Sequence, residues 1–284
     1  MILITGANGQ LGHDLQRIFR ERKQDFIATD YKELDITDID AVREFVKGKD
    51  IKLIINCAAY NNVDKAEEES EMCYKLNAYA PRDLAIVAKE IDAEYVTYST
   101  DFVFNGEKKS PYTEEDEVSP LSVYSKAKAE GEKLVLESYE NSFVIRTSWV
   151  FGIANNNFNR QVINWSKSRD VLGIVDDQTS VPTYSYDLAL YSLKLIETKQ
   201  YGLYHLSNSG VASKYDQAKY VLESIGWTGT LNEAKSSDFI LPAPRAEYSK
   251  LDSSKLEAVI GEKLPTWESG IDRFLEEMRE KGEL

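Results

Sequence analysis

The stretch "ILITGANGQLG" at residues 2–12 joins a short apolar run to three evenly spaced glycines. The run "ILIT" (2–5) predicts a buried strand, and a helix is expected to follow the glycines. Gly6, Gly9 and Gly12 fall in the turn between the two elements. Glycine permits a tight turn, lets the backbone approach a ligand and lets the helix pack near the sheet. This turn is therefore predicted to present a helix N-terminus to an anion.

Short apolar runs alternate with helix signals through the first half of the chain. Strands that are apolar along nearly their whole length are typical of a parallel sheet covered on both faces. Thr37 with Asp40 resembles a capping pair that would start the second helix. The predicted strands are 2–5, 26–29, 52–59, 94–100 and 142–149, and helices are expected from about residue 10, near 38–46, through 77–90 and from 123.

Beyond about residue 150 the alternation loosens. The stretches "NNNF" (155–158) and "DDQTSVPTYS" (176–185) resemble loops. Later helices are expected near 186–198, 213–225 and 266–280. The sequence thus predicts an α/β fold with a Rossmann-like doubly wound parallel sheet in residues 1–150. A smaller, partly interleaved substrate domain is predicted for residues 151–284.

An acid follows the second predicted strand. Asp30 lies 18 positions after Gly12, near the place where a carboxylate binds the ribose hydroxyls of an adenosine. Strand, glycines, helix, second strand and acid together predict a dinucleotide site, although the G-x-x-G-x-x-G spacing is one residue longer than the common fingerprint. A carboxylate at Asp30 repels a 2′-phosphate and favours NADH, whereas the nearby Lys32 leaves NADPH open.

The stretch "VYSKAKAEGE" (123–132) carries Tyr124 four residues before Lys128. On a helix this spacing puts the phenol and the ammonium on one face. A neighbouring cation is expected to lower the tyrosine pKa, which suits a proton donor. Tyr215 and Lys219 have the same spacing, so the pair alone is weak evidence and can be an ordinary solvated face.

Composition narrows the classes of partner. The 284 residues carry a net charge of −14, from 48 acidic and 34 basic side chains. An acidic field of this size argues against nucleic-acid and anionic-membrane surfaces. Cys57 and Cys73 show no metal-ligand spacing, and no apolar run approaches the ~20 residues of a membrane span. The opening "MILITG" has no basic, cleavable leader pattern, so a cytoplasmic location is expected.

Hydroxyl groups at Ser99 and Thr100 end the strand in "YSTDFVF" (98–104), at an edge where ligands bind parallel sheets. Hydroxyl, tyrosine and lysine in this order, after such a glycine turn, resemble the extended short-chain dehydrogenase/reductase family. Further motifs narrow the resemblance to its dTDP-4-dehydrorhamnose reductase family over nearly the entire chain. These motifs, in order, are "GxxGQLG", "NCAAYNNVDKAE", "LNA", "YSTDFVF", "VYSKAKAEGE", "RTSWVFG" and "DDQTSVPT".

The resemblance implies roles for particular side chains. Tyr124, Lys128 and Thr100 would be catalytic, with Tyr124 and Lys128 also touching the cofactor. The other cofactor contacts would be Gly6, Gly9, Gln10, Leu11, Gly12, Asp30, Asp35, Ile36, Ala59, Tyr60, Asn61 and Tyr98. The substrate contacts would be Thr100, Asp101, Trp149 and Arg245. A core aromatic is the alternative for Trp149, and a helix-start acid is the alternative for Asp35.

Two departures from the family pattern stand out. Ala246 follows Arg245 where these reductases commonly have an Arg-Pro pair, so a role of Arg245 with the substrate diphosphate is insecure. Some members bind Mg²⁺ at a dimer contact through glutamates. In the resemblance Asp14 and Asp187 take two such places with shorter side chains; a Mg²⁺ site is one interpretation and surface acids are the alternative. A homodimer is possible.

The implied reaction is reduction of the C4 ketone of dTDP-4-dehydro-6-deoxy-L-mannose by NADH or NADPH, giving dTDP-L-rhamnose. One alternative is a nucleotide-sugar epimerase or dehydratase, which shares the glycine turn and the Tyr/Lys pair but returns the hydride. Another is a non-catalytic regulatory subunit on the same fold, resembling that of methionine adenosyltransferase. The intact set of Thr100, Tyr124 and Lys128 speaks against the regulatory alternative.

Overall fold

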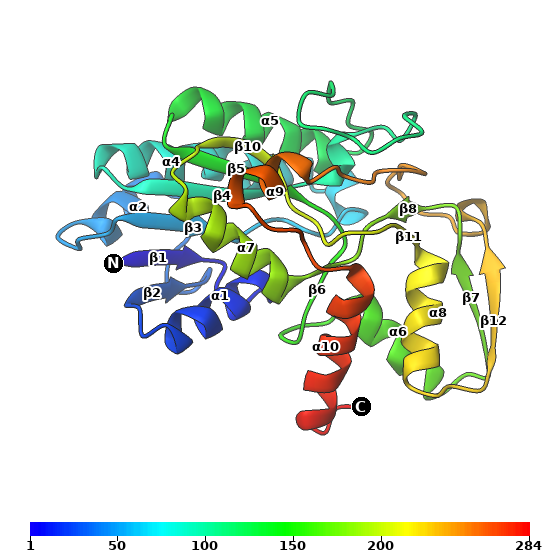
Figure 1. The fold of residues 1–284 in the computed structure, drawn as a ribbon. Coiled ribbons are helices and arrows are strands. Elements are labelled where there is room, and N and C mark those ends of the chain that lie inside the picture. Colours follow the sequence, from blue (N-terminus) through cyan, green and yellow to red (C-terminus); the bar gives the residue numbers. More distant parts are fainter.

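A computed structural model describes residues 1–284 and places a six-stranded parallel sheet at the centre of the larger lobe (Figure 1). Every neighbouring pair in this sheet is parallel. The strand order reverses beside β1, and ligands of doubly wound folds bind at such a switch point. In spatial order the strands are β10 (Gly202–His205), β5 (Ser142–Thr147), β4 (Glu94–Thr100), β3 (Leu53–Asn56), β1 (Ile2–Thr5) and β2 (Phe26–Thr29).

Helices cover both faces of the sheet, which explains why its strands are buried and apolar (Figure 1). One face packs α2 (Ile39–Val46), α4 (Ala80–Glu90) and α5 (Val123–Ser138). The other face packs α1 (Gln10–Glu21), α7 (Ser185–Glu197) and α9 (Ser254–Ile260). Ahead of α4, the short helix α3 (Ser70–Tyr74) continues through a wider π-helical turn at Lys75–Tyr79.

A smaller lobe has its own core, in which Phe151 and Phe274 are buried edge to face. Its helices are α6 (Phe158–Ser166), α8 (Lys214–Ser224) and α10 (Trp267–Glu280). Its parallel strands β7 (Val171–Val175) and β12 (Thr230–Ala234) lie beside α8 in Figure 1. Short strands β6 (Val150–Phe151) and β9 (Thr183–Tyr184), and β8 (Thr179–Ser180) and β11 (Ala212–Ser213), form two further pairs.

The predicted α/β class and parallel sheet are confirmed, but the sheet takes its sixth strand, β10, from the second half of the chain. Helix α7 likewise packs on the sheet. Residues 185–205 lie in the larger lobe although they follow residue 150 in sequence. A domain boundary at residue 150 stays a prediction. The sequence reasoning did not predict α6, β7 or β12.

One capping prediction is wrong. Asp38, not Thr37, caps α2, since its carboxylate accepts the backbone N–H groups of Asp40 and Ala41 at 3.1 and 3.0 Å. Thr37 instead donates its hydroxyl to Asp35 at 2.7 Å.

None of the helices combines the length and the apolarity that crossing a bilayer demands.

An ion pair inside the larger lobe joins β5 to α5. Arg146 donates to both carboxylate oxygens of Glu132 at 2.9 and 2.7 Å, and the two side chains are 4% and 6% exposed. His205 of β10 lies 3.3 Å from the same guanidinium. Burial, and secondly the charge of Arg146, lowers the pKa of His205 to about 3, so this imidazole is neutral.

We expect Arg146→Met to lower the free energy of unfolding by about 3–5 kcal/mol, because it leaves the Glu132 carboxylate buried without its counter-charge. Urea unfolding followed by circular dichroism measures the change. Arg43→Met is the matched control, since Arg43 makes a similar two-pronged pair with Glu90 in solvent and should change stability far less. Equal small losses in both variants would mean that water solvates Glu132.

Candidate active site

A cavity of about 390 Å³ opens at the carboxyl ends of β1, β3, β4 and β5. This is the switch point of the sheet, where the sequence analysis predicts ligand-binding residues. The predicted site residues that line it are Gly9, Gln10, Leu11, Ala59, Asn61, Tyr98, Thr100, Tyr124, Lys128 and Trp149. Those that do not are Gly6, Gly12, Asp30, Asp35, Ile36, Tyr60, Asp101 and Arg245.

The first turn depends on two glycines that lie just behind the cavity wall. Gly6 has a φ of +66°, and a Cβ there would lie 2.4 Å from the backbone nitrogen of Ala58. A Cβ on Gly12 would lie 2.5 Å from the carbonyl oxygen of Gly6. Gly9 precedes α1 without any side-chain cap, so the helix N-terminus faces the cavity with free N–H groups. This arrangement suits an anionic ligand.

Asp30 lies beside the turn rather than in the cavity wall. One carboxylate oxygen accepts the N–H of Asn8 at 3.0 Å, and the other accepts the N–H of Tyr31 at 2.8 Å. The contact with Asn8 ties the end of β2 to the glycine turn. Its role toward a ribose stays a prediction.

Asp35 and Ile36 lie farther along the same edge. The Asp35 carboxylate accepts the N–H and the hydroxyl of Thr37 at 2.9 and 2.7 Å. Burial raises the pKa of Asp35, but these two hydrogen bonds outweigh it and the net pKa is lowered. Ile36 belongs to the core below α2 and α4. Asp35 thus closes a turn before α2, and cofactor contact by either residue stays a prediction.

The segment after β3 is held in place by Asn77. The Asn77 amide accepts the N–H of Tyr60 and donates to the Tyr60 carbonyl oxygen, both at 2.9 Å. This double contact aligns Ala59 and Asn61 along the cavity while the Tyr60 hydroxyl turns away to Glu69 at 2.7 Å. The motif "LNA" contains Asn77, but its partner lies 17 residues away and is not readable from the motif.

The predicted pair on α5 does face the cavity. Tyr124 is 8% and Lys128 7% exposed, and the Lys128 ammonium donates to the Tyr98 carbonyl oxygen at 3.0 Å. The expectation that the pKa of Tyr124 is lowered is wrong for the protein without bound cofactor. Burial raises the pKa of Tyr124, and hydrogen bonding with Thr100 offsets only part of that effect. Burial also lowers the pKa of Lys128 to about 8, with Glu132 opposing it.

Thr100 lines the cavity, but its neighbour Asp101 points into the protein. The Asp101 carboxylate accepts hydroxyl hydrogens from Thr100, Ser180 and Ser249 at 3.2, 2.8 and 2.5 Å. Burial raises the pKa of Asp101 to about 6, although the three hydroxyls lower it. Asp101 therefore joins β4 to two distant segments, and its contact with substrate stays a prediction.

Trp149 lines the cavity in a left-handed backbone conformation, with a φ of +44°. A bulky residue adopts this conformation at a cost, which is commonly found at functional sites. The Lys214 ammonium lies 3.5 Å from the centroid of its indole ring. The sequence reasoning singled out Trp149 but not Lys214, which comes from a helix 65 positions later.

The loop at 155–157 also completes the cavity and was not predicted to do so. Asn155 donates its side-chain amide to the carbonyl oxygen of Asn8 at 2.7 Å, and Gln10 donates to the Asn155 carbonyl oxygen at 2.8 Å. Asn156 and Asn157 then line the cavity. The three consecutive asparagines mark a loop, but nothing in them reports a contact 145 residues away.

Arg245 does not line the cavity that contains Tyr124. Its guanidinium donates to both oxygens of Asp64 at 2.9 and 2.7 Å. It lines a neighbouring cavity of about 540 Å³, which also contains Phe158 and Lys214. The prediction that Arg245 meets a substrate diphosphate is untested, and the Asp64 pair already neutralises its charge.

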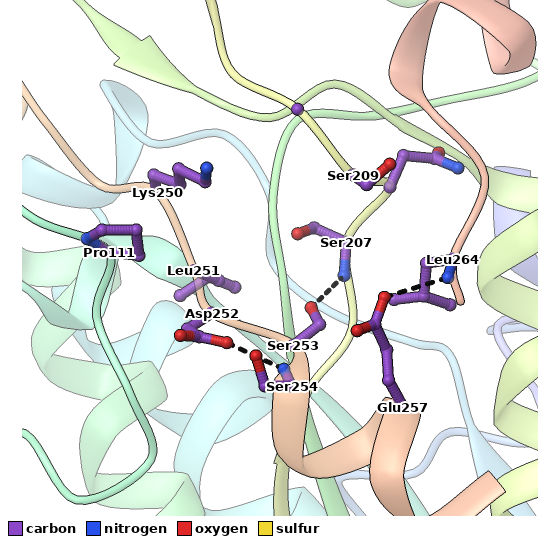
Figure 2. A pocket seen from close by; sticks show the side chains of 12 residues that line it. Pro111, Ser207, Ser209, Lys250, Leu251, Asp252, Ser253, Ser254, Glu257 and Leu264 are labelled. Atoms are coloured by element: carbon purple, nitrogen blue, oxygen red, sulfur yellow. Dashed lines mark hydrogen bonds between the residues drawn. The ribbon is translucent and has the colours of Figure 1, made fainter. Parts of the chain in front are cut away.

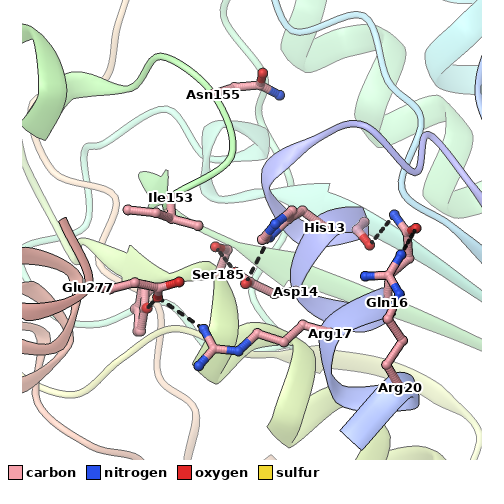
Figure 3. A network of polar contacts seen from close by, with 12 residues as sticks. His13, Asp14, Gln16, Arg17, Arg20, Ile153, Asn155, Ser185 and Glu277 are labelled. Carbon is pink, nitrogen blue, oxygen red and sulfur yellow. Dashed lines mark hydrogen bonds and ion pairs between the residues drawn. The ribbon is translucent and has the colours of Figure 1, made fainter. Parts of the chain in front are cut away.

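The reading of Asp14 and Asp187 as surface acids is wrong, because they are 1% and 2% exposed. Figure 3 shows Asp14 on α1 directed toward Ser185, which donates to it, with His13 at 3.3 Å from its other oxygen. Arg273 donates to both oxygens of Asp187 at 2.6 Å. No cluster of three or more His, Cys, Asp or Glu suited to a metal occurs in the chain. Mg²⁺ at a dimer contact stays a prediction.

A second polar cavity, of about 250 Å³, contains none of the predicted site residues (Figure 2). Two of its polar side chains already accept hydrogen bonds from the backbone: Ser253 accepts the N–H of Ser207, and Glu257 accepts the N–H of Leu264. The cavity beside Tyr124 is different, because the Gln10 side-chain oxygen and the hydroxyls of Ser99 and Thr147 lack partners in the chain. Unpaired buried polar atoms of this kind fit a ligand.

A glycine turn at a parallel switch point, with a tyrosine, a lysine and a threonine in the crevice, defines the short-chain dehydrogenase/reductase class of NAD(P)-dependent oxidoreductases. Residues 1–280 match the family model described as the RmlD substrate binding domain, and the chain belongs to this family.

Named relatives agree with this placement. The dTDP-4-dehydrorhamnose reductase of Aggregatibacter actinomycetemcomitans is 36% identical, over 95% of this chain and 96% of that protein. A crystal structure of a dTDP-4-dehydrorhamnose reductase from Clostridium acetobutylicum is similar with a TM-score of 0.95 and 40% identity, covering 98% and 99% of the two chains. A reductase of the same name from Bacillus anthracis, in complex with NADP, gives a TM-score of 0.94 and 36% identity, covering 97% and 98%.

The buried ammonium of Lys128 has a stability cost that depends on pH. A lysine whose pKa falls from 10.5 to about 8 on folding destabilises the protein fully below pH 8, and the cost vanishes as the pH rises toward 10.5. We therefore expect Lys128→Met without cofactor to be more stable than the parent near pH 7, by up to about 3 kcal/mol. The advantage should shrink between pH 8 and 10.5 in urea unfolding.

Lys219→Met, on an exposed position of α8, is the control and should show no such pH-dependent difference. If the free energy of unfolding of Lys128→Met equals that of the parent at every pH, the ammonium is solvated in the free protein.

Proposed function

We propose that this protein reduces the C4 ketone of dTDP-4-dehydro-6-deoxy-L-mannose with NAD(P)H and releases dTDP-L-rhamnose. The observation that carries the proposal is the meeting of Tyr124, Lys128 and Thr100 in one cavity next to the glycine turn. The relatives named as dTDP-4-dehydrorhamnose reductases, matched over nearly the full chain, support the same reaction.

The residues present fit a nicotinamide dinucleotide. The uncapped start of α1 suits the pyrophosphate, and the absence of a Cβ at Gly6 and Gly12 lets the turn lie close to the sheet. Gln10 and Asn61 line the same cavity and bring polar groups to it. When bound, the reduced nicotinamide supplies the hydride for the ketone carbon.

The proton for the ketone oxygen comes from a side chain of the protein. Burial keeps the Tyr124 phenol protonated in the free site, so a proton is ready for the ketone oxygen. The Thr100 hydroxyl can donate a hydrogen bond to that oxygen and hold it beside the phenol. Lys128 on the same helix face can orient a ribose and favour the phenolate that proton transfer leaves behind.

The enzymes that epimerise or dehydrate nucleotide sugars provide the contrast. They keep their cofactor and return the hydride, whereas a reductase consumes one reduced nicotinamide per product. An assay of reduced-cofactor oxidation with the dTDP-4-keto sugar therefore tests the proposal. Product formed without net oxidation would refute it. A cytoplasmic, homodimeric enzyme is our working proposal for its setting.

We expect Tyr124→Phe to lower turnover by about 10²–10⁴-fold, because it removes the proton donor, with little change in the affinity for NADH or NADPH. Steady-state oxidation of the reduced cofactor and a fluorescence titration measure the two effects. Tyr215→Phe is the matched control from the second Tyr/Lys pair, and it should retain near-normal turnover. Near-normal turnover of Tyr124→Phe would exclude Tyr124 from the mechanism.

Asp30 is proposed to favour NADH, although the related reductase in complex with NADP shows that NADP binds within this family. Asp30→Ala should shift the preference toward NADPH, because a negative charge near the adenosine ribose is lost. The ratio of kcat/KM for the two cofactors measures the shift. A wild type that already prefers NADPH strongly, with no change in Asp30→Ala, would place the ribose elsewhere.

A further inference from the structure

Lys214 occupies an unusual position between two aromatic rings. It is the first residue of α8, and its ammonium lies 3.5 Å from the ring centroid of Trp149 and 4.6 Å from that of Phe158. Cation–π contact stabilises an ammonium in such a slot, but it supplies no hydrogen-bond acceptor. The three donor hydrogens of the group are left for something else.

Several features make this placement costly in the free protein. The ammonium makes no hydrogen bond or ion pair, and the one nearby charge that favours its protonated form is that of Asp101. Both Asp101 oxygens are already taken by hydroxyl groups. Burial lowers the pKa of Lys214 to about 7. A cation at the first position of a helix also opposes the helix dipole. An anionic ligand would offset all of these costs.

The ammonium lies where two cavities adjoin. Phe158 lines both the cavity of about 390 Å³ that contains Tyr124 and the cavity of about 540 Å³ that contains Lys214. Of the other cations of the larger cavity, Arg245 is paired with Asp64 and Arg169 is exposed at the rim. In a chain with a net charge of −14, Lys214 is thus the free positive charge at this junction.

We propose that Lys214 is a binding residue for the diphosphate of the nucleotide-sugar substrate. The sugar then lies against Tyr124, and the nucleoside lies beyond Phe158 in the larger cavity, where 8 of the 15 lining residues are hydrophobic. This inference rests on the proposed function, because it needs a nucleoside diphosphate joined to the sugar. It assigns the charge recognition to Lys214 rather than to Arg245, which the family pattern suggested.

The test compares dTDP with thymidine by calorimetry on the protein saturated with NADPH. Lys214→Met keeps the aliphatic length and removes the charge, so dTDP should bind about 10- to 100-fold more weakly while thymidine binds within twofold of the parent. Lys214→Arg should restore most of the dTDP affinity. Lys219 is an exposed lysine on the same helix, and Lys219→Met should leave the affinity for both ligands unchanged.

Neither probe carries the keto-hexose that is expected to contact Trp149, so an effect on dTDP alone cannot arise from a displaced Trp149. Equal weakening of dTDP and thymidine would reduce Lys214 to a packing role, and unchanged dTDP binding in Lys214→Met would overturn the inference outright. The cofactor-oxidation assay on the parent protein is independent of both results. If the parent neither oxidises NADPH with the dTDP-4-keto sugar nor binds dTDP, the proposed function fails with the inference.

Discussion

The first turn of the chain passes directly against the backbone that follows β3, and the contact leaves no room for a side chain. A Cβ on Gly6 would lie 2.4 Å from the Ala58 nitrogen, and one on Gly12 would lie 2.5 Å from the Gly6 carbonyl oxygen. Because both atoms are absent, α1 starts close to the sheet and its free N–H groups face the crevice. The part of the cavity wall that the first turn forms follows from this close approach.

Long-range polar contacts then complete the wall. Asp101, at the end of β4, gathers Ser180 and Ser249 from the second half of the chain. Asn155 reaches back to the first turn, and Asn77 holds the backbone of Tyr60. Asp101 and Asn77 are buried polar groups satisfied by other segments of the chain, which is how low-dielectric interiors specify one arrangement, whereas Asn155 makes its contact at the exposed rim. The two lobes therefore meet at the site through defined hydrogen bonds.

Burial sets the pKa values of the titratable groups in the site. Burial raises the pKa of Tyr124 and lowers those of Lys128 and Lys214 to about 8 and 7. Such groups cost stability in the free protein and become useful when charge arrives with a ligand. The ion pair of Glu132 with Arg146, one turn along α5 from Lys128, shows the opposite case, in which the protein supplies both charges itself. Functional and structural charges are thus distinguished by whether a partner is already present.

The sequence by itself determined the α/β class, five strands of the sheet, the glycine turn and the helix face shared by Tyr124 and Lys128. These features are local: they depend on periodicity over a few residues and on the φ freedom of glycine. Only the tertiary structure decided that β10 closes the sheet, that Asp101 turns inward, that burial raises the pKa of Tyr124, and that Lys214 lies over Trp149. Those outcomes depend on contacts between residues far apart in the chain and on the water they exclude, and neither is encoded in any short stretch of sequence.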